Sequence, residues 1–554
     1  MIDKKPHTAA RRTRMNPWSV GAFAIAVLVL APLLAVLWIA LNPVDNIWPH
    51  LLSTTLPRYL RTTAVLAVSV AVLSAAMGTG AAWLVVMYRF PFSRMLQWLL
   101  LLPLAIPAYV GAYALVDFLE YAGPVQTTLR QVFGWQTSRD YWFPEIRSLG
   151  SAILVLSAAL SPYVFLMARA AFREQSGSIY EVARALGAGP FARFWRVGLP
   201  MARPAIAAGV AIVMMETVSD FGTVSYFAVQ TLTTGIFTVW LELNNAGGAA
   251  QIAGVVLLVV GLLVGLEKLS RGRARFHGNT RQQRKVVPMT LTGWTGWLAT
   301  ALCLVPFAFG FVLPVGVIGY HAVKNARQWA DPALLEALLN TLTVAGLAAI
   351  VTVCAAIFMV YGVRLTGRRL PRVLLPVTTL GYAAPGAVLG IGILIPLAAL
   401  DNIIADAIEA LFGVDPGLLM TGSAFAIVLA YTVRFFAIAQ GAADAAMGRV
   451  APSLPMAARS LGKTAGGTLR RIYVPIMRGS VGTALLLVFV DSVKELPATL
   501  LLRPFNYDTL ATRVFEKAGL EQIGQAAPAA ILVISVGLIA VGLMARSESR
   551  PSAE

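Results

Sequence analysis

The segment ARALGAGPFARFWRVGLPMAR, residues 183–203, returns later in the chain as ARSLGKTAGGTLRRIYVPIMR, residues 458–478. The two segments align without a gap at an offset of 275 residues. The identical pairs are Ala183 and Ala458, Arg184 and Arg459, Leu186 and Leu461, Gly187 and Gly462, Arg196 and Arg471, Pro200 and Pro475, and Arg203 and Arg478. A repeat of this length at two distant places in the chain indicates a duplicated unit.

Further landmarks recur in the same order in both copies. TLTTGIF at 231–237 matches TLATRVF at 509–515 at an offset of 278 residues. The other matched pairs are Leu60 with Leu339, Thr62 with Thr341, Pro107 with Pro385 and Val110 with Val388. The common order predicts one unit that has been duplicated and fused.

The composition places both copies in a membrane. Of the 554 residues, 58% are hydrophobic and 13% are charged, and the mean hydropathy is +0.73. These values exclude a water-soluble globular enzyme. The apolar residues form runs of about 20, the length that crosses a bilayer core as a helix. The predicted spans lie near residues 19–41, 63–88, 97–116, 149–168, 205–227, 249–266, 293–320, 341–363, 373–398, 420–433, 479–500 and 525–545.

The tenth run is short, and we expect it to continue past Arg434 through FFAIAQ. With six spans in each copy, the chain is predicted to be an all-α membrane protein of twelve transmembrane helices. Because six is even, both copies enter the membrane from the same side, so the repeats are parallel and related by an axis along the membrane normal. The expected parts are an N-terminal segment 1–18, a first membrane domain 19–266, a basic linker 267–292, a second membrane domain 293–545 and a C-terminal tail 546–554.

Positive charge predicts the orientation of the spans. The chain has 44 Lys and Arg residues against 26 Asp and Glu residues, a net charge of +18. Most of the basic residues lie in the segments on the side of the two termini, which the positive-inside rule assigns to the cytoplasm. The basic stretch 271–287 is expected to be a cytoplasmic linker attracted to anionic lipid, with no support for a nucleic-acid partner. We therefore expect a multi-pass membrane protein with both termini cytoplasmic.

The sequence contains no metal or nucleotide motif. The cysteines and histidines are far apart in the chain, so no tight metal site is predicted. The string SLGKT at 460–464 ends like a phosphate-binding loop, but Ala457 stands where that loop needs its first glycine. We therefore expect that this chain binds no nucleotide or cofactor itself and is not an enzyme.

The string EVARALGAGPFARFWRVGLP, residues 181–200, resembles the EAA loop of permease subunits from binding-protein-dependent ABC importers. It has a Glu, an Ala two residues later, then a Gly and a closing Leu-Pro, and the second copy lies at the corresponding place. The resemblance covers essentially the whole chain as a tandem permease of the type I importer fold, most similar to the fused permeases for ferric iron. It implies two copies of a cytoplasmic ABC ATPase and a periplasmic substrate-binding protein as partners, besides membrane lipid.

In this family the loop helix docks into a groove of the ATPase and transmits its closure to the spans. The positions that would make the contact are Glu181, Ala183, Gly187 and Pro200 in the first copy, and Met456, Ala458, Gly462 and Pro475 in the second. Two positions depart from the pattern, because Val182 stands in place of the usual first Ala and Met456 in place of the acidic residue. The second contact is therefore expected to differ from the first.

The fifth span of each copy contains two acidic residues four positions apart. The pairs are Glu216 with Asp220 and Asp491 with Glu495, related by the offset of 275 residues. A charge at this depth costs at least about 2.5 kcal/mol and faces a bundle interior or a water-filled cavity. Residues i and i+4 share a helix face, and parallel repeats bring both pairs toward one axis, so we expect a shared translocation path. Alternatively, the carboxylates pair with Lys494, cap a broken helix or bond to nearby hydroxyls.

Carboxylate and tyrosine oxygens are donors that hard, highly charged cations prefer. Tyr109, Tyr113 and Tyr226 could supply tyrosine oxygens on the same or neighbouring spans. The path therefore favours a cationic cargo, and with the resemblance we expect ferric iron, delivered by the periplasmic protein and moved across the inner membrane. Thiamine, a polyamine, a phosphonate or another small solute would suit the same importer class.

Two other classes of protein remain open from the residues alone. An ion-coupled secondary transporter would use the four carboxylates to carry protons or sodium. A membrane scaffold or channel would not need them for transport. The repeated EAA-like loops favour the importer, because neither alternative needs a docking site for an ATPase.

Overall fold

The computed structural model describes residues 17–272, 286–366, 369–379, 381 and 384–549. The remaining positions of the expected N-terminal segment, linker and tail lie outside the described residues. Within these ranges the chain is helical apart from one short parallel strand pair, β1 (Tyr88–Arg89) and β2 (Met289–Thr290). The prediction of an all-α membrane fold is confirmed.

The first half of the chain runs from α1 to α13. Its helices are α1 (Pro17–Leu41), α2 (Trp48–Ser53), α3 (Leu56–Met87), α4 (Ser93–Leu99), η1 (Leu102–Ala105), α5 (Ala108–Leu119), α6 (Pro124–Phe133), α7 (Leu149–Glu174), α8 (Gly177–Ala185), α9 (Pro190–Arg193), η2 (Phe194–Gly198), α10 (Leu199–Ser219), α11 (Gly222–Tyr226), α12 (Leu232–Phe237), η3 (Thr238–Glu242) and α13 (Ala246–Gly272). Of the short η elements, η1 is a 3₁₀-helix, whereas η2 and η3 are π-helical turns.

The second half repeats much of this order. Its helices are α14 (Trp294–Phe307), η4 (Ala308–Val312), α15 (Leu313–Lys324), η5 (Ala326–Ala330), α16 (Pro332–Thr366), α17 (Arg369–Thr378), α19 (Gly386–Phe412), α20 (Phe425–Gly448), α21 (Ser453–Ser460), α22 (Ala465–Thr468), η6 (Leu469–Tyr473), α23 (Val474–Lys494), α24 (Pro497–Leu502), α25 (Leu510–Gly519) and α26 (Ile523–Ser549). The runs α9–η2–α10 and α22–η6–α23 are equivalent, and each has a π-helical turn at the same place.

The described chain contains eleven helical runs that are long and apolar enough to cross a membrane, and a bent pair of helices brings the number to as many as twelve. Each run overlaps one of the predicted spans. The tenth is α20, which extends through Arg434 to Gly448, as expected.

The third predicted span, 97–116, is wrong as a single helix. Its two parts, Ser93–Ala105 and Ala108–Phe133, meet at an angle of 94°. The break follows from Pro107, because a residue before proline is driven out of the helical region. Ile106 accordingly adopts φ −105° and ψ 123°.

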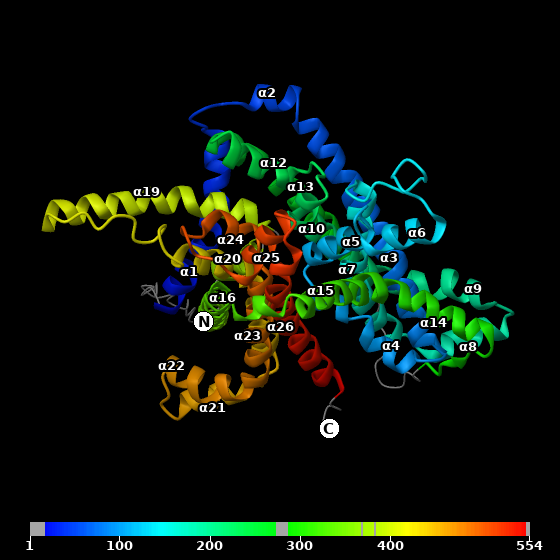
Figure 1. Cartoon of the computed structure of the whole chain (residues 1–554). Coiled ribbons are helices and arrows are strands. Elements are labelled where there is room, and N and C mark those ends of the chain that lie inside the picture. Colours follow the sequence, from blue (N-terminus) through cyan, green and yellow to red (C-terminus); the bar gives the residue numbers. More distant parts are fainter. Residues whose placement is uncertain (1–16, 273–285, 367–368, 380, 382–383, 550–554) are drawn as a thin grey trace, which may run out of the picture.

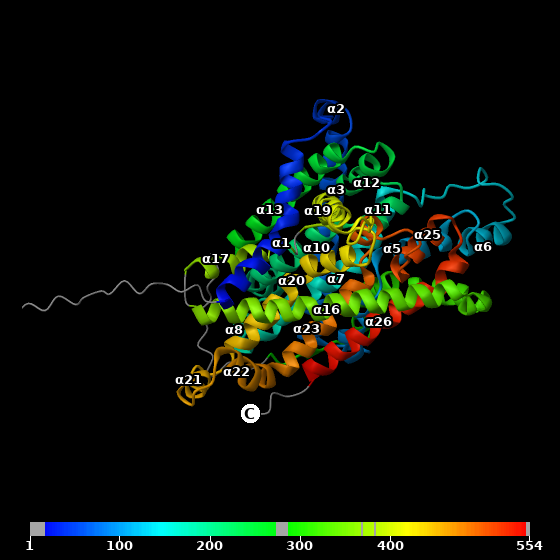
Figure 2. The same cartoon turned by 90° about the vertical axis from the view of Figure 1, so that its left-hand side faces the viewer.

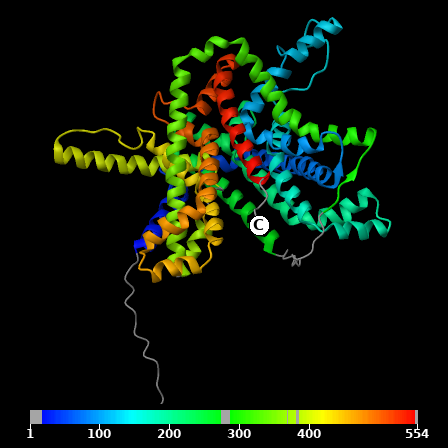
Figure 3. The same ribbon diagram turned by 90° about the horizontal axis from the view of Figure 1, so that it is seen from below.

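The fifth and eleventh spans, predicted over 205–227 and 479–500, are also interrupted. α10 ends at Ser219 and α23 ends at Lys494, and a short separate helix follows each break. The ninth span, predicted over 373–398, divides into α17 and α19. Figure 3 shows α19 continuing well beyond the body of the molecule as one helix, whereas the first half has two helices, α5 and α6, at the equivalent place.

The first helix of each half packs mainly on the other half. α1 lies against α16 and α19, and its buried residues Ala22, Ala26 and Val29 share a core with the second half. In return α15 packs against α5, and Figure 1 shows α14 and α15 lying beside α3, α4 and α5. The two halves are therefore interlocked around a common interior.

The two copies of the EAA-like segment lie toward the same end of the molecule. Figure 1 shows α8 and α9 on one side and α21 and α22 on the other, with the C-terminal end of α26 between them. Figure 2 shows α21 and α22 at the end opposite to α2 and α12. This arrangement is the one expected for parallel repeats.

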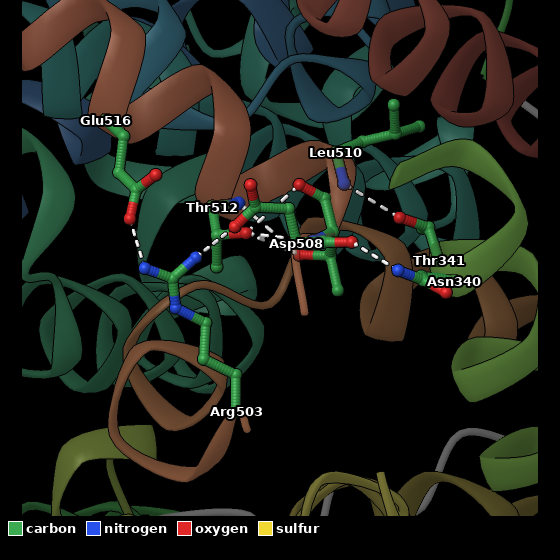
Figure 4. Close-up of polar contacts among 8 residues, drawn as sticks. Asn340, Thr341, Arg503, Asp508, Leu510, Thr512 and Glu516 are labelled. Atoms are coloured by element: carbon green, nitrogen blue, oxygen red, sulfur yellow. Dashed lines mark hydrogen bonds and ion pairs between the residues drawn. The ribbon is translucent and has the colours of Figure 1, made fainter. Parts of the chain in front are cut away.

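A buried threonine locks the same turn in each half. Thr63 Oγ1 accepts a hydrogen bond from the backbone N–H of Leu232 at 3.0 Å, and Thr341 Oγ1 accepts one from Leu510 at 2.8 Å (Figure 4). Thr63, and not the predicted Thr62, is therefore the equivalent of Thr341, because Thr63 and Thr341 accept the same hydrogen bond in their halves. The helices that follow, α12 and α25, each begin with a threonine capping box.

In the second half the turn before α25 has further polar support. Asn340 Nδ2 donates to the backbone carbonyl of Asp508 at 3.0 Å, and Arg503 forms ion pairs with both Asp508 and Glu516 (Figure 4). α16 and α25 are thereby joined through groups 168 or more residues apart in the chain.

We predict that Thr341→Val destabilises the protein by about 1–3 kcal/mol, because the buried N–H of Leu510 loses its acceptor while the side-chain shape is kept. Thermal unfolding of the purified protein in detergent measures the change. Thr343→Val is the matched control, since Thr343 is exposed and its hydroxyl bonds within its own helix to the Leu339 carbonyl. Equal melting temperatures for the two variants would contradict the prediction.

Candidate functional site

Two carboxylates stand where the fifth span of each half breaks. Asp220 and Glu495 follow α10 and α23 directly and leave the helix with nearly the same backbone conformation, ψ 135° and 121°. Asp220 Oδ1 accepts from the N–H groups of Thr223 and Val224 at 3.1 Å, and Oδ2 accepts from the Thr223 hydroxyl at 2.9 Å. Such bonds satisfy the first N–H groups of a helix, which have no partner within it.

Glu495 performs the same task one repeat later. Its Oε1 accepts from the N–H of Ala498 at 3.1 Å, and its backbone carbonyl accepts from the Thr499 hydroxyl at 2.9 Å. The backbone carbonyl of Asp220 likewise accepts from Thr233 at 2.6 Å. Capping of a broken helix, one of the alternatives weighed from the sequence, is thus what one carboxylate of each pair does.

The four carboxylates line one cavity of about 180 Å³ between the halves. Glu216 and Asp220 reach it from α10 and its break, and Asp491 and Glu495 from α23 and its break. The break in the third span supplies another wall, including Tyr109 at the start of α5. The remaining lining residues include Pro103, Leu104, Pro107, Tyr163, Met215, Phe221, Arg434, Phe435, Lys494 and Leu496.

Two of the carboxylates are paired with cations inside the cavity. Arg434 Nε lies 3.1 Å from Glu495 Oε2, and these side chains are only 13% and 4% exposed. Lys494 Nζ lies 3.3 Å from Asp491 Oδ1 and also donates to the backbone carbonyl of Leu104 at 3.3 Å. Among the described lining residues, four formal negative charges face two positive ones. The cavity therefore carries a formal excess of two negative charges, and both of these cations come from the second half.

Arg434 was missed as a site residue by the sequence reasoning, which treated it only as a point through which the tenth span continues. The available signal was the one used for the acidic residues, a charge inside an apolar run. Among the described lining residues, the first half contributes no lysine or arginine, so Arg434 has no basic counterpart there.

The tyrosines expected near the path do not all reach it. Tyr109 lines the cavity and is 5% exposed. Tyr226 is not among the described lining residues; its ring packs edge-on against Tyr113, with centroids 4.4 Å apart, and the Arg147 guanidinium lies 5.1 Å from its centroid. The reason is the break at Asp220, which places Tyr226 on the separate helix α11.

The two EAA-like segments end in the same backbone motif. Gly187 follows α8 with φ 82°, and Gly462 follows α21 with φ 77°. In each, the glycine N–H bonds to the carbonyl three residues back at 3.0 Å, and the next N–H bonds to the carbonyl of Ala183 or Ala458. A left-handed residue at this position is the common helix stop and favours glycine.

The proposed contact positions are mostly open to solvent. Glu181, Gly187, Pro200, Met456, Gly462 and Pro475 are exposed, Ala183 is half-buried and Ala458 is buried. Beside the glycines, Leu186 and Leu461 are 82% and 78% exposed. Each segment thus presents a large apolar side chain at its helix stop, and the first presents an acidic group where the second has a thioether.

We predict that Glu495→Gln costs about 3–5 kcal/mol of stability, because it removes the carboxylate that forms an ion pair with the buried guanidinium of Arg434. The double variant with Arg434→Met is expected to recover most of the loss. Asp444→Asn is the control, since Asp444 pairs with Arg364 at the surface and should cost at most about 1 kcal/mol. Additive losses in thermal unfolding of the double variant would contradict the coupling.

Comparison with known proteins agrees with this arrangement. Residues 67–266 match the family model described as binding-protein-dependent transport system inner membrane component. The Fe(3+)-transport system permease protein FbpB 2 of Haemophilus influenzae is 25% identical over 498 residues, covering 88% of this chain and 89% of that protein. The putative ferric transport system permease protein FbpB 1 of the same organism is 23% identical over 76% of this chain and 65% of its own length.

A shorter relative covers about a third of the chain. The molybdenum transport system permease protein ModB of Escherichia coli is 28% identical over 203 residues, which is 35% of this chain and 85% of ModB. A single-unit permease of this kind is thus about as long as one of the two repeats. Residues 67–266 belong to the family of inner membrane components of binding-protein-dependent transport systems, and the chain is a fused permease of this type.

Proposed function

We propose that this permease moves ferric iron across the inner membrane as part of an ATP-driven importer. The observation that carries the proposal is the shared cavity, in which each half places two carboxylates at equivalent positions and acid exceeds base by two formal charges. Ferric iron is a hard cation that takes oxygen ligands. Relatives named for ferric or Fe(3+) transport align over most of this chain, which supports the same cargo.

An oxyanion cargo is less compatible with this interior. The relatives named for molybdenum and sulfate transport align with about a third of the chain. A cavity with excess negative charge repels oxyanions and phosphonates, whereas thiamine and polyamines share the positive charge of iron. Uptake measurements must therefore compare cations of different hardness.

The energy would come from two copies of a cytoplasmic ABC ATPase docked on α8 and α21. In each half one helical run, Pro190–Ser219 or Ala465–Lys494, leads from beside the docking segment to the cavity. Thirty residues of helix extend about 45 Å, so a displacement at the docking segment moves the carboxylate at the far end directly. ATP and magnesium would be bound by the ATPase, while a periplasmic binding protein delivers cargo at the opposite end.

This proposal places both termini and both EAA-like segments in the cytoplasm. The charge distribution of the sequence supports that orientation, and the two segments lie toward one end of the molecule, away from α2 and α12. An ion-coupled secondary transporter is the competing class. It would leave the exposed apolar residues Leu186 and Leu461 without a partner.

The direct test is uptake of labelled ferric iron, thiamine and a polyamine by cells that depend on this permease, its ATPase and its binding protein. We expect ATP-dependent iron uptake, reduced roughly tenfold or more by Glu216→Gln and by Asp491→Asn, which weaken the attraction for a trivalent ion. These two residues are chosen because the described caps use Asp220 and Glu495 instead.

Glu336→Gln, at an exposed position of α16, serves as the control and should leave uptake unchanged. Iron uptake that persists after ATP depletion would contradict the importer. ATP-dependent uptake of thiamine or a polyamine without iron would contradict the cargo.

For the docking segments, we predict that Gly187→Trp and Gly462→Trp each reduce association with the ATPase while membrane insertion persists. No atom lies within 4 Å of a Cβ at either position, so the new side chain projects outward into the partner's space. Gly134→Trp is the matched control, with φ 72° and an equally open Cβ in the loop after α6. Co-purification measures the effect, and equal ATPase recovery from all three variants would contradict the docking surface.

A further inference from the structure

The cavity is asymmetric in one specific way. Arg434 belongs to the second half, and among the described lining residues the first half contributes no lysine or arginine. The neighbouring position differs as well, since Pro107 is followed by Ala108 and Pro385 by Gly386. These two differences concern the same space.

Gly386 makes room for the guanidinium. A Cβ at this position would lie 2.2 Å from Glu495 Oε1 and 2.7 Å from Arg434 Nη1, both impossibly close. The first residue of α19 therefore lies directly over the ion pair, and only glycine fits there without displacing it. Gly386, Arg434 and Glu495 together therefore form a site that accommodates the guanidinium group.

In the ion pair, the Arg434 guanidinium occupies the position beside Glu495 that a cargo cation would otherwise take. Glu495 is 4% exposed in its side chain and uses one oxygen for the helix cap and the other for Arg434. A buried carboxylate needs such compensation. With Arg434 in place, the second half offers less free negative charge to a cargo than it would otherwise.

Tyr109 supplies an independent sign of a ligand. It lines the same cavity and is 95% buried, and among the described residues its hydroxyl oxygen has no hydrogen-bond partner. A buried polar group in a native protein normally has a partner. An oxygen donor left open beside carboxylates suits a hard cation.

We propose that Arg434 is an internal counter-cation that competes with the cargo cation for Glu495. It satisfies the carboxylate while the cavity is empty and weakens the hold on a cargo ion bound near Glu216, Glu495 and Tyr109, so that the ion is released. The inference rests on the proposed function, since it requires a cationic cargo in this cavity. It adds a residue that sets how tightly the path holds its cargo.

The test uses the purified permease–ATPase complex in detergent with Tb³⁺, a hard trivalent probe whose luminescence is excited through a nearby tyrosine such as Tyr109. Arg434→Gln is expected to bind Tb³⁺ roughly tenfold more tightly, because a competing charge has gone. Adding Glu495→Gln to this variant should remove the gain. Arg364→Gln is the matched control, since Arg364 also pairs with a carboxylate, Asp444, but at the surface.

A merely structural arginine gives the opposite pattern, with weaker Tb³⁺ binding in Arg434→Gln. If that variant is unstable, thermal unfolding with and without Tb³⁺ supplies the second measurement. Stabilisation by Tb³⁺ should then be larger in Arg434→Gln than in the unaltered protein. Equal or smaller stabilisation, or a gain in affinity that survives Glu495→Gln, would overturn the inference.

The same Tb³⁺ measurements distinguish a failure of this inference from a failure of the proposed function on which it rests. If the unaltered complex binds Tb³⁺ and Glu216→Gln weakens that binding, the cationic cavity stands, and an unchanged affinity in Arg434→Gln overturns only the role of Arg434. If the unaltered complex does not bind Tb³⁺ at all, the cationic cavity and the role of Arg434 are both overturned.

Discussion

The interior of this protein is organised by the need to satisfy backbone N–H groups where a helix breaks inside a membrane. Hydrocarbon offers no hydrogen bonds, so a break at this depth survives only if the protein supplies the partners. In both halves the helix of the fifth span ends, at Ser219 or Lys494, and the next residue, Asp220 or Glu495, accepts hydrogen bonds from backbone N–H groups of the helix that follows. These carboxylates thus have a structural role that does not depend on any role in transport.

The basic residues of the cavity compensate these buried carboxylates. A buried carboxylate requires compensation, and the second half provides it with Arg434 and Lys494, each within 3.3 Å of an acidic partner. The excess of negative charge that remains is what gives the cavity its proposed preference for a cation. The observed structural role and the proposed transport role therefore fall on the same residues, which explains why the alternatives weighed from the sequence were not mutually exclusive.

The two repeated units share their backbone features and differ in the EAA-like segments and in the cavity, the two places where partners and cargo are proposed to bind. The glycine stops after α8 and α21, the π-helical turns η2 and η6, and the threonine capping boxes recur almost unchanged. The differences fall at Glu181 against Met456 on the EAA-like segments, and in the cavity, where the described basic residues Arg434 and Lys494 both come from the second half. The helices that connect the EAA-like segment to the cavity are thus similar in the two units, whereas the residues at the two ends of these helices differ.

The sequence by itself determined the class of fold, the approximate place of each span and the repeat, because these depend on local hydropathy and spacing. It also located the four carboxylates and Tyr109 that line the cavity. Only the tertiary structure decided that the third and fifth spans break, that Tyr226 lies away from the cavity and that Thr63 is the counterpart of Thr341. It also revealed Arg434 beside Glu495, 61 positions later in the chain. The reason is physical: a helix break, a cap and an ion pair depend on which distant groups share a space, and hydropathy along the chain carries no record of that.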